Sequence, residues 1–555
     1  MDVESIIRKY ALQNAAQFSG KASVGAVLGK VMAENPELRQ RAKEISSVAK
    51  GIVEEVNKMS REAQRRALEE LAPELLQRVS KTREVGLPDL PGVTGEVRMR
   101  LAPNPSGPLH LGHSRMAILN DEYVKRYGGR CINRFEDTDP ARVDPTGYET
   151  IPQDLEWLGV KVHETIIQSD RFELYYDVAR RLLEMGKAYV CECRPDTWRE
   201  LKNRKVACPH REQPLSEQLS RWDRMFDGTY GPEEASLVIK TDLEHPNPAI
   251  RDFVGLRIDD TPHPRTGTRY RVYPLMNLAV AVDDYMLNLT HVLRGKDHLN
   301  NTYRQEYIYR YMGWKMPVFI HYGRVSIEEA QLKKSATAKG IRDGQYSGWD
   351  DPRLGTLQAL RRRGIRPEAI RRYWVETGIK EVDIAFSWKT LYSFNRELID
   401  DTADRYFFVW DPVKLRIEGA PELVARAPVH PEHPERGVRE LRVGPEPEVF
   451  VCSSDLERRP RRLRLKDLCN IELEGTRARY AGNDLSILKE GVQIVHWVPT
   501  NSLDAEILMT DGSVRKGLAE PMIKRALGKV VQLERFAYVR VESVSPSVRC
   551  VFTHT

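Results

Sequence analysis

The chain has 555 residues, and at roughly 150 residues per domain this length predicts three or four domains. Lysine and arginine number 86 against 80 acidic residues, an excess of six that is too diffuse to identify a nucleic-acid-binding protein. The composition, with 41% hydrophobic and 30% charged residues, excludes a disordered polar chain, a collagen-like repeat and a small disulfide scaffold.

Export and membrane insertion are not expected. The longest apolar stretch, residues 273–287, is interrupted by Asp283 and Asp284, and no run approaches the roughly 20 apolar residues that a membrane helix needs. The first ten residues, MDVESIIRKY, carry acids where a secretion signal has a basic and then an apolar region. Seven scattered cysteines are typical of reduced thiols, so we expect a cytoplasmic protein.

Residues 1–94 predict an N-terminal helical extension. Apolar residues recur at three- and four-residue spacing from Ile45 to Val56, and Ser60 followed by Glu62 is typical of a capped helix start. The segment LPDLPG at residues 87–92 predicts a linker. For this extension we expect packing or the docking of a protein partner.

Strands and helices alternate from residue 97 onward. The pattern predicts a strand over 97–102, a Pro-rich loop over 103–108, a helix over 109–127 ending at two glycines, and a strand over 130–135. Such a βαβ unit implies a parallel sheet with a ligand crevice at the carboxyl ends of its strands. Further helices are predicted over residues 146–158, 171–185, 300–311 and 357–363.

The chain becomes strand-rich after about residue 410. Short β-rich runs cover residues 463–465, 492–498, 507–509, 530–533 and 537–541, with a turn signal at 510–513. This pattern predicts an all-β region of sandwich or barrel type. Residues 421–447 are rich in Pro, His and Glu, and we expect a loop there, with His430 and His433 facing solvent.

The segment RLAPNPSGPLHLGHS, residues 100–114, carries the strongest chemical signal. It runs from a strand end into a helix start, so His110 and His113 lie on one face of the first helical turn. The helix N-terminus adds free N–H donors and partial positive charge, a combination that suits a triphosphate. Gly112 removes a side chain where a flat base could lie against the backbone.

This segment resembles the HIGH signature of class I aminoacyl-tRNA synthetases, in the form of the glutamyl/glutaminyl branch. Residues 331–335, QLKKS, resemble the family's KMSKS loop and retain its second lysine and final serine. Residues 347–354, SGWDDPRL, are a branch marker to which the residue types assign no chemistry, so we expect a packing role. The resemblance implies ATP with Mg²⁺ as cofactor, the catalytic residues His110, His113 and Lys334, and the ATP contacts Gly112, Arg324, Val325, Leu332 and Ser335.

The amino acid that is activated follows from a second set of residues. Arg100 and Arg294 supply guanidinium groups, which suit a planar carboxylate, and Glu136 stands where glutaminyl enzymes usually carry Asp. Asn104 departs from the Ser common in bacterial glutamyl enzymes. By resemblance, the glutamate site comprises Arg100, Ala102, Asn104, Glu136, Tyr273, Asn277 and Arg294.

The implied function is the ATP-dependent attachment of L-glutamate to tRNA(Glu) in two steps through glutamyl-adenylate, with glutamine–tRNA ligase as the alternative. Whether tRNA(Gln) is also a partner stays open. A small-molecule nucleotidylyltransferase would not need the C-terminal β region. A non-catalytic RNA-binding relative would have lost one of His110, Gly112, His113 or Lys334, and none is lost.

Three cysteines and one histidine have the spacing of a metal site. Cys191, Cys193, Cys208 and His210 offer three thiolates and one imidazole, enough for tetrahedral Zn²⁺ in a structural role. Ordinary buried thiols are the alternative.

The resemblance implies an α/β fold with the following domains. A Rossmann-like class I catalytic domain has its first half at residues 95–200 and its second half, with the KMSKS-like loop and a helical connector, at 291–405. An inserted domain that binds the tRNA acceptor end lies at 201–290. The N-terminal helical extension is residues 1–94, and all-β barrels that bind the anticodon are residues 406–555.

Overall fold

The computed structural model describes residues 3–17, 20–35, 38, 41–72, 86–328, 330–444, 447–457, 460–474 and 477–555. The chain divides into two compact units, Met1–Gly86 and Leu87–Thr555, and each is considered by itself. Residues 73–85 of the expected helical extension lie outside the described residues. Every described helix is too short or too polar to span a lipid bilayer.

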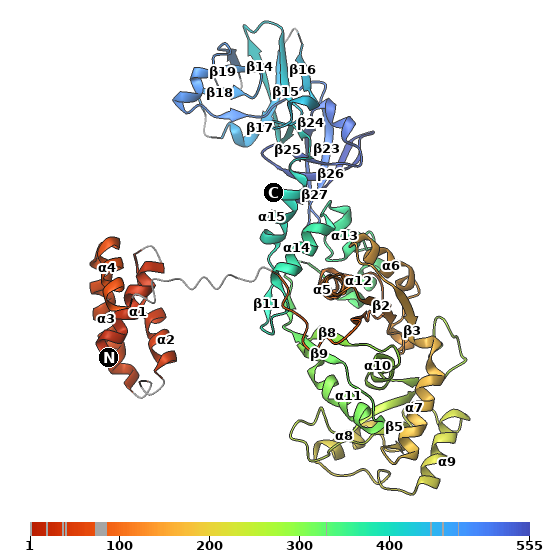
Figure 1. Ribbon diagram of the computed structural model, residues 1–555. Coiled ribbons are helices and arrows are strands. Elements are labelled where there is room, and N and C mark those ends of the chain that lie inside the picture. Colours follow the sequence, from red (N-terminus) through yellow and green to blue (C-terminus); the bar gives the residue numbers. More distant parts are fainter. Residues whose placement is uncertain are drawn as a thin grey trace. The chain divides into compact units, whose positions relative to one another are not determined.

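The first unit is helical (Figure 1). Its elements are α1 (Val3–Gln17), α2 (Val24–Glu34), α3 (Ala42–Lys58) and α4 (Arg61–Leu71). Ile45 and Val56 of α3 are buried in a core that all four helices share. The Ser60 hydroxyl accepts a hydrogen bond of 3.2 Å from the Ala63 N–H, so α4 begins at the predicted cap.

A doubly wound parallel sheet forms the centre of the second unit. Strands β1 (Arg98–Leu101), β2 (Arg130–Phe135) and β3 (Glu164–Ile167) are parallel, with α5 (Leu111–Tyr127) as the first crossover, so the predicted βαβ unit is confirmed. Strand β8 (His291–Gly295) pairs in parallel with β9 (Val318–Tyr322). The Thr290 N–H donates to the Arg98 carbonyl at 3.0 Å, which places β8 beside β1. The strand order β3-β2-β1-β8-β9 reverses between β1 and β8, and ligands of such sheets bind at that point.

A second, antiparallel sheet interrupts the first along the chain. Its strands are β4 (Ala188–Cys191), β5 (Ser236–Ile239), β6 (Phe253–Ile258) and β7 (Val272–Pro274). Around it lie α7 (Phe172–Glu184), α8 (Pro195–Asn203), α9 (Leu215–Phe226) and α10 (Met276–Met286), and the whole insert has its own apolar core (Figure 1).

Helices follow the parallel sheet and connect it to the β region. They are α12 (Lys334–Arg342), α13 (Leu357–Arg362), α14 (Pro367–Thr377) and α15 (Trp388–Ile399), with a short parallel pair β10 (Val325–Ser326) and β11 (Ile384–Ala385). Within the sheet, α11 (Leu299–Met312) is the crossover between β8 and β9. The helices predicted over 146–158, 171–185, 300–311 and 357–363 correspond to α6 (Gly147–Trp157), α7, α11 and α13, so these predictions are confirmed.

In the described part of the β region there are two seven-stranded sheets, each closed by one short segment. In the first, the edge strands are β21 (Ile494–Val495) and β22 (Val498–Pro499), and between them lie β14 (Pro412–Glu418), β17 (Glu448–Cys452), β18 (Arg462–Leu465), β19 (Cys469–Glu474) and β20 (Arg477–Tyr480). In the second, the edges are β12 (Arg405–Tyr406) and β13 (Phe408–Trp410), and between them lie β23 (Leu503–Leu508), β24 (Val514–Ala519), β25 (Val530–Leu533), β26 (Ala537–Ser543) and β27 (Val548–His554). Because both edges of each sheet belong to one continuous stretch of chain, each sheet curls round into a barrel.

The loop predicted over residues 421–447 is wrong in part. This stretch contains a hairpin of β15 (Leu423–Pro428) and β16 (Val438–Val443), in which buried and exposed residues alternate. His430 is fully buried, with Nε2 2.9 Å from the Asp400 carbonyl, so its predicted exposure is also wrong. The His433 ring contacts Asp401 and Glu435 and is about a quarter exposed (26%). The proline-rich composition masked the alternation of apolar and polar residues along these two strands. Through the apolar residues, the hairpin packs on the barrel.

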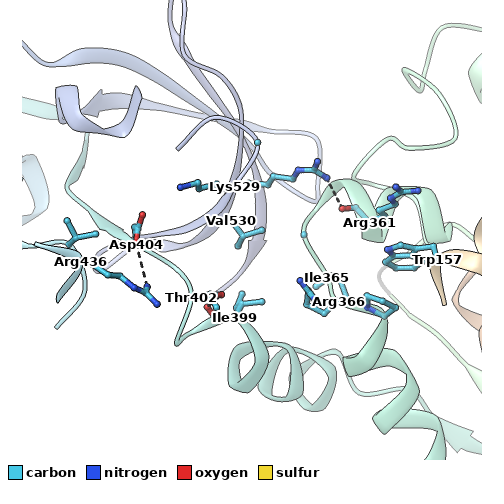
Figure 2. A pocket seen from close by; sticks show the side chains of 15 residues that line it. Trp157, Arg361, Ile365, Arg366, Ile399, Thr402, Asp404, Arg436, Lys529 and Val530 are labelled. Carbon is cyan, nitrogen blue, oxygen red and sulfur yellow. Dashed lines mark hydrogen bonds and ion pairs between the residues drawn. The ribbon is translucent and has the colours of Figure 1, made fainter. Parts of the chain in front are cut away.

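A cavity of about 920 Å³ lies where the connecting helices meet the second barrel (Figure 2). Basic side chains line it, among them Arg361, Arg366, Arg436 and Lys529, and Arg436 pairs with Asp404 at 3.6 Å. No site residue predicted from the sequence lines this cavity.

Candidate active site

The two predicted histidines cap the helix that leaves β1. The His110 Nδ1 accepts from the Gly112 N–H at 3.0 Å, and the His113 Nδ1 accepts from the His110 N–H at 3.3 Å. The two rings stack with centroids 3.7 Å apart. Because both Nδ1 atoms are acceptors, both Nε2 atoms carry the hydrogen and are left to donate. A Cβ at residue 112 would lie 2.9 Å from the His110 Cε1, so Gly112 admits the folded-back ring.

Both imidazoles are neutral at pH 7. Burial and, to a smaller extent, the nearby Lys334 lower the pKa of His110 to about 4. Burial, His110 and Lys334 lower the pKa of His113 well below its usual value. The pair therefore offers two N–H donors and no charge, which suits phosphate oxygens as they gain charge in a transition state.

The predicted catalytic lysine lies at this same helix mouth. Lys334 begins α12, and its Nζ donates to the Gly107 carbonyl at 3.0 Å. Burial lowers the pKa of Lys334 to about 8, although Asp154 and Asp144 oppose this shift. Loops more than 200 residues apart in the chain thus form one cationic site.

Asp154 is a residue of this site that the sequence did not single out. It lies on the buried face of α6, and its Oδ2 accepts from the Leu109 N–H at 2.7 Å, at the start of the histidine loop. Burial raises its pKa to about 7. A lone acid on the apolar face of a predicted helix was the available signal.

The predicted adenine contact lies in β10. The Arg324 carbonyl accepts from the Ile384 N–H at 3.0 Å, and the Ser326 carbonyl accepts from the Phe386 N–H at 2.8 Å. Because backbone amides alternate in direction along a strand, the N–H and C=O of Val325 point away from β11. Leu332 packs on Gly355, and Ser335 is exposed in the first turn of α12.

Arg100 and Arg294 occupy neighbouring strands at the sheet reversal. Both are buried, and Arg294 donates to the Thr302 Oγ1 at 2.5 Å and to the Gln305 Oε1 at 3.0 Å. Gln305 in turn donates to the Asn277 Oδ1 at 3.4 Å. Among the described residues, no carboxylate lies within 4.0 Å of the Arg294 guanidinium. Burial and the adjacent Arg100 lower the pKa of Arg294 to about 10, although Asp284 and Glu136 oppose this shift from beyond ion-pair distance.

Two buried acids and a third arginine complete the pocket. Arg134 pairs with Asp284 at 2.6 Å and with Glu136 at 2.8 Å, and Arg100 lies 3.8 Å from Asp284. Asp283 pairs with Arg171 at 2.8 Å. Sequence reasoning noted the two aspartates as interruptions of an apolar stretch and assigned them no role. Charges in the middle of an apolar helix were the signal that could have found them.

The other predicted glutamate contacts are Asn104, Ala102 and Tyr273. Asn104 donates from Nδ2 to the Glu136 carbonyl at 2.9 Å, and its buried Oδ1 has no partner. Ala102 is half-buried just after β1. Tyr273 lies in the core of the insert, where its hydroxyl donates to the Thr261 carbonyl at 3.3 Å. The structure gives it no hydrogen bond to the two pocket arginines.

The cysteines and histidine predicted to bind metal converge. The ligand atoms of Cys191, Cys193, Cys208 and His210 lie within 4.8 Å of one another, and five of the separations are 3.4–3.8 Å. Tetrahedral zinc, with bonds near 2.3 Å to sulfur and 2.0 Å to nitrogen, would separate its ligand atoms by about 3.5–3.8 Å. The His210 Nε2 lies 3.5 Å from the Glu192 carboxylate, which orients the ring.

Comparison with known proteins identifies the family. Residues 96–401 match the catalytic domain of class I tRNA synthetases (E and Q), and residues 403–488 match the anti-codon binding domain of the same class. The chain belongs to this family, and the fold predicted from the resemblance, an α/β catalytic domain followed by β-barrels, is confirmed.

Full-length relatives narrow the class further. The chain is 50% identical to the glutamate–tRNA ligase of Methanothermobacter thermautotrophicus, over 100% of this chain and 99% of that relative. It is 49% identical to the glutamate–tRNA ligase of Pyrococcus horikoshii, over the full length of both. A solved glutamate–tRNA synthetase from Elizabethkingia anophelis aligns over 55% of this chain and 71% of that chain, at 23% identity and a TM-score of 0.38, which is too low to establish a shared overall fold.

Proposed function

We propose that this chain attaches L-glutamate to tRNA(Glu) at the expense of ATP, through glutamyl-adenylate. Its family and its full-length relatives, which carry the name glutamate–tRNA ligase, support the reaction class. The structural observation that carries the choice of amino acid is Arg294, a buried guanidinium that no carboxylate of the described residues neutralises. A buried unpaired charge costs several kcal/mol, and a carboxylate substrate removes that cost on binding.

Glutamate and glutamine differ in what they offer this arginine. The side-chain carboxylate of glutamate brings a full negative charge and two planar acceptors to a guanidinium fork. A glutamine amide brings no net charge and places an N–H₂ donor where Arg294 and Arg100 can only donate. The pocket therefore favours glutamate over glutamine.

In the first step, the glutamate α-carboxylate attacks the α-phosphorus of ATP, a new P–O bond forms, and pyrophosphate leaves. The Nε2–H groups of His110 and His113 donate to the phosphate oxygens as their charge grows. The N-terminus of α5 adds its partial positive charge, since the N–H groups of its first turn are bonded within the protein. Lys334 supplies a cation for the leaving pyrophosphate. Mg²⁺ bound to ATP neutralises further phosphate charge. The protein contributes positioning and electrostatics, with no covalent enzyme intermediate.

In the second step, a hydroxyl of the terminal tRNA adenosine attacks the adenylate carbonyl, and AMP leaves. By family resemblance, this is the 2′-hydroxyl. The barrels are proposed to bind the anticodon, because residues 403–488 match the family's anticodon-binding domain. Charging of tRNA(Gln), docking of a protein on the helical extension and a cytoplasmic location stay predictions.

The test is ATP–pyrophosphate exchange with each amino acid, in the presence of tRNA(Glu). Exchange supported by glutamate and not by glutamine is expected; the reverse pattern would overturn the assignment. Arg100→Ala is expected to abolish the glutamate-dependent signal while the thermal unfolding temperature changes little. Charging assays with purified tRNA(Glu) and tRNA(Gln) decide whether one or both are substrates.

We also propose that Cys191, Cys193, Cys208 and His210 hold a structural Zn²⁺. The ligand-atom separations support four-coordinate binding, and the Cys193 and His210 N–H groups each donate to a neighbouring sulfur at 3.4 Å, which favours thiolates. Elemental analysis of the purified protein is expected to find one zinc per chain, and Cys193→Ser is expected to lower that occupancy. Metal-free protein with unchanged thermal stability would reject the site.

A further inference from the structure

Residues 347–357, which we call the strap, contain the branch marker to which sequence analysis assigned only packing. The strap lies against the histidine loop. The Leu111 N–H donates to the Gly355 carbonyl and the Leu357 N–H donates to the Leu109 carbonyl, both at 2.9 Å. The strap is thus bonded to the backbone on both sides of His110.

The same strap also lies against the lysine loop. The Gly355 N–H donates to the Gln331 carbonyl at 3.2 Å, and a Cβ at residue 355 would lie 2.4 Å from the Leu332 Cδ2. Gly355 therefore bonds to the histidine loop through its carbonyl and to the lysine loop through its N–H. A larger residue at 355 would displace the Leu332 side chain of the lysine loop.

Trp349 of the strap packs on the residue that holds the catalytic lysine. A Cβ at Gly107 would lie 3.0 Å from the Trp349 Cζ2, and Gly107 has φ of 110°, a conformation that side chains disfavour. The Gly107 carbonyl accepts the hydrogen bond from the Lys334 Nζ. The indole thus fixes the peptide group to which the lysine is bound.

The strap is itself stiff. The buried Asp351 carboxylate accepts from the Arg353 Nε at 2.8 Å, from the Arg353 Nη2 at 2.7 Å and from the Ser347 N–H at 3.0 Å. The Thr356 hydroxyl donates to the Trp349 carbonyl. A segment closed by its own hydrogen bonds can hold two loops at a constant separation.

We propose that the strap sets the position of Lys334 relative to the His110–His113 pair, and that Trp349 is a positioning residue for that lysine. The proposal rests on the proposed function, in which both loops act on one ATP. Groups that act together on a transition state must hold their geometry within about 0.5 Å. The strap is hydrogen-bonded to both loops, so it can hold the lysine loop and the histidine loop at a fixed separation.

The experiment compares Trp349→Ala and Trp349→Phe with a control, Trp314→Ala, which removes a half-buried indole stacked on Tyr285 at 4.4 Å, in the core of the insert. Trp349→Ala is expected to lower kcat of glutamate-dependent exchange about tenfold to a hundredfold, since displacement by about 1 Å can cost that much. The KM for glutamate is expected to stay within about twofold, because Arg100 and Arg294 do not contact the strap. Trp349→Phe is expected to recover most of the loss.

A second measurement reports the pKa of Lys334 and does not depend on catalysis. The groups that face Lys334 are His110 and His113 from the histidine loop and Asp144 and Asp154 from the side of α6. Acetic anhydride labels the neutral amine, so labelling of Lys334 against pH, followed by mass spectrometry of its peptide, reports its pKa. The midpoint is expected near 8 in the wild type and nearer the usual 10.5 in Trp349→Ala, because water reaches the ammonium.

The outcomes separate this proposal from the proposed function. Absence of glutamate-dependent exchange in the wild type would reject the function, while the labelling midpoints would still test the strap. If the wild type supports exchange, an unchanged kcat in Trp349→Ala would reject the positioning role of the strap. An unchanged midpoint for the labelling of Lys334 would reject it as well. Loss of kcat and a shifted midpoint in Trp314→Ala as well would also reject it, because the effect would then follow from general destabilisation.

Discussion

Arg294 is the single residue on which the proposed choice of glutamate depends. Arg134, by contrast, is matched by Asp284 and Glu136 at 2.6 and 2.8 Å. Arg294 instead donates to the neutral oxygens of Thr302 and Gln305. Neutral partners hold the guanidinium in place without cancelling its charge, so the charge stays available to an anionic ligand.

Arg294→Gln is predicted to raise the KM for glutamate by about tenfold to a hundredfold, since a hydrogen bond to a charged group contributes about 1.5–3 kcal/mol. Folding stability is expected to stay level or to rise, because a buried unpaired charge is removed. The glutamate dependence of exchange and a thermal unfolding scan measure both effects. Arg180→Gln, at an exposed pair with Glu184, is the control; an unchanged KM in Arg294→Gln would contradict the role.

At the scale of elements, the N-terminus of α5 performs two functions with the same side chains. His110 is the N-cap of the helix through Nδ1 and leaves Nε2 for ligands. A proton on Nδ1 would break the cap, so helix stability and ligand binding both require the neutral ring. The pKa of His110, lowered to about 4, ensures this state at pH 7.

His110→Asn is predicted to separate the two functions. In the wild type, the unfolded histidine binds a proton below about pH 6.5 and the folded one only near pH 4, so stability falls as pH drops through this window, by at most about 1.4 kcal/mol per pH unit for one group. Asn keeps an acceptor for the helix cap and does not titrate. The loss of folding stability between pH 7 and pH 5 should therefore be smaller in His110→Asn than in the wild type. Exchange should fall about a hundredfold or more, because a phosphate donor is lost.

Urea unfolding at pH 7 and pH 5 measures this difference. The matched control is His433→Asn. The Asp401 and Glu435 carboxylates raise the pKa of His433, so its protonation favours the folded state, whereas protonation of His110 disfavours it. An equal loss of stability in wild type and His110→Asn would show that His110 is not a source of the acid sensitivity.

At the scale of the whole second unit, the connecting helices are bonded to the second barrel. Arg363 donates to the Thr553 carbonyl at 2.8 Å and to the Tyr392 hydroxyl at 2.7 Å, and Asn395 lies 3.0 Å from the His554 Nε2. Arg362 pairs with Glu542 at 2.7 Å. These bonds lie close to the basic cavity of Figure 2, whose lining includes Arg361 and Arg366. If one tRNA binds both the catalytic domain and the barrels, as proposed, this junction sets the distance between its two binding sites.

Arg363→Ala is predicted to weaken the junction by about 1–3 kcal/mol, since buried carbonyl groups lose their donor. The KM for tRNA in aminoacylation should rise several-fold, while the KM for ATP should stay near its wild-type value. Arg372→Ala, at an exposed pair with Glu376 on α14, is the comparison variant. Equal changes in both KM values would show that the substitution acts on the catalytic domain as a whole.

The local pattern of apolar and turn residues determined much of this protein's secondary structure. The βαβ unit, the helices α6, α7, α11 and α13 and the strand-rich C-terminal region follow from periodicity and turn residues, because those signals reflect which face of each element is buried. The histidine pair could be placed at a helix start because capping is a local property of the chain. Residues 100 and 294 could be paired only through resemblance to a family.

Tertiary structure decided the rest, because charge compensation and burial depend on residues distant in the chain. It showed that Asp284 neutralises Arg134 while Arg294 has no such partner, and that His430 is buried beneath a hairpin. It also placed the strap between two loops whose sequence separation exceeds 200 residues. Sequence reveals which groups can bear charge or donate hydrogen bonds, whereas only the fold determines which of them remain unmatched and thus available to a substrate.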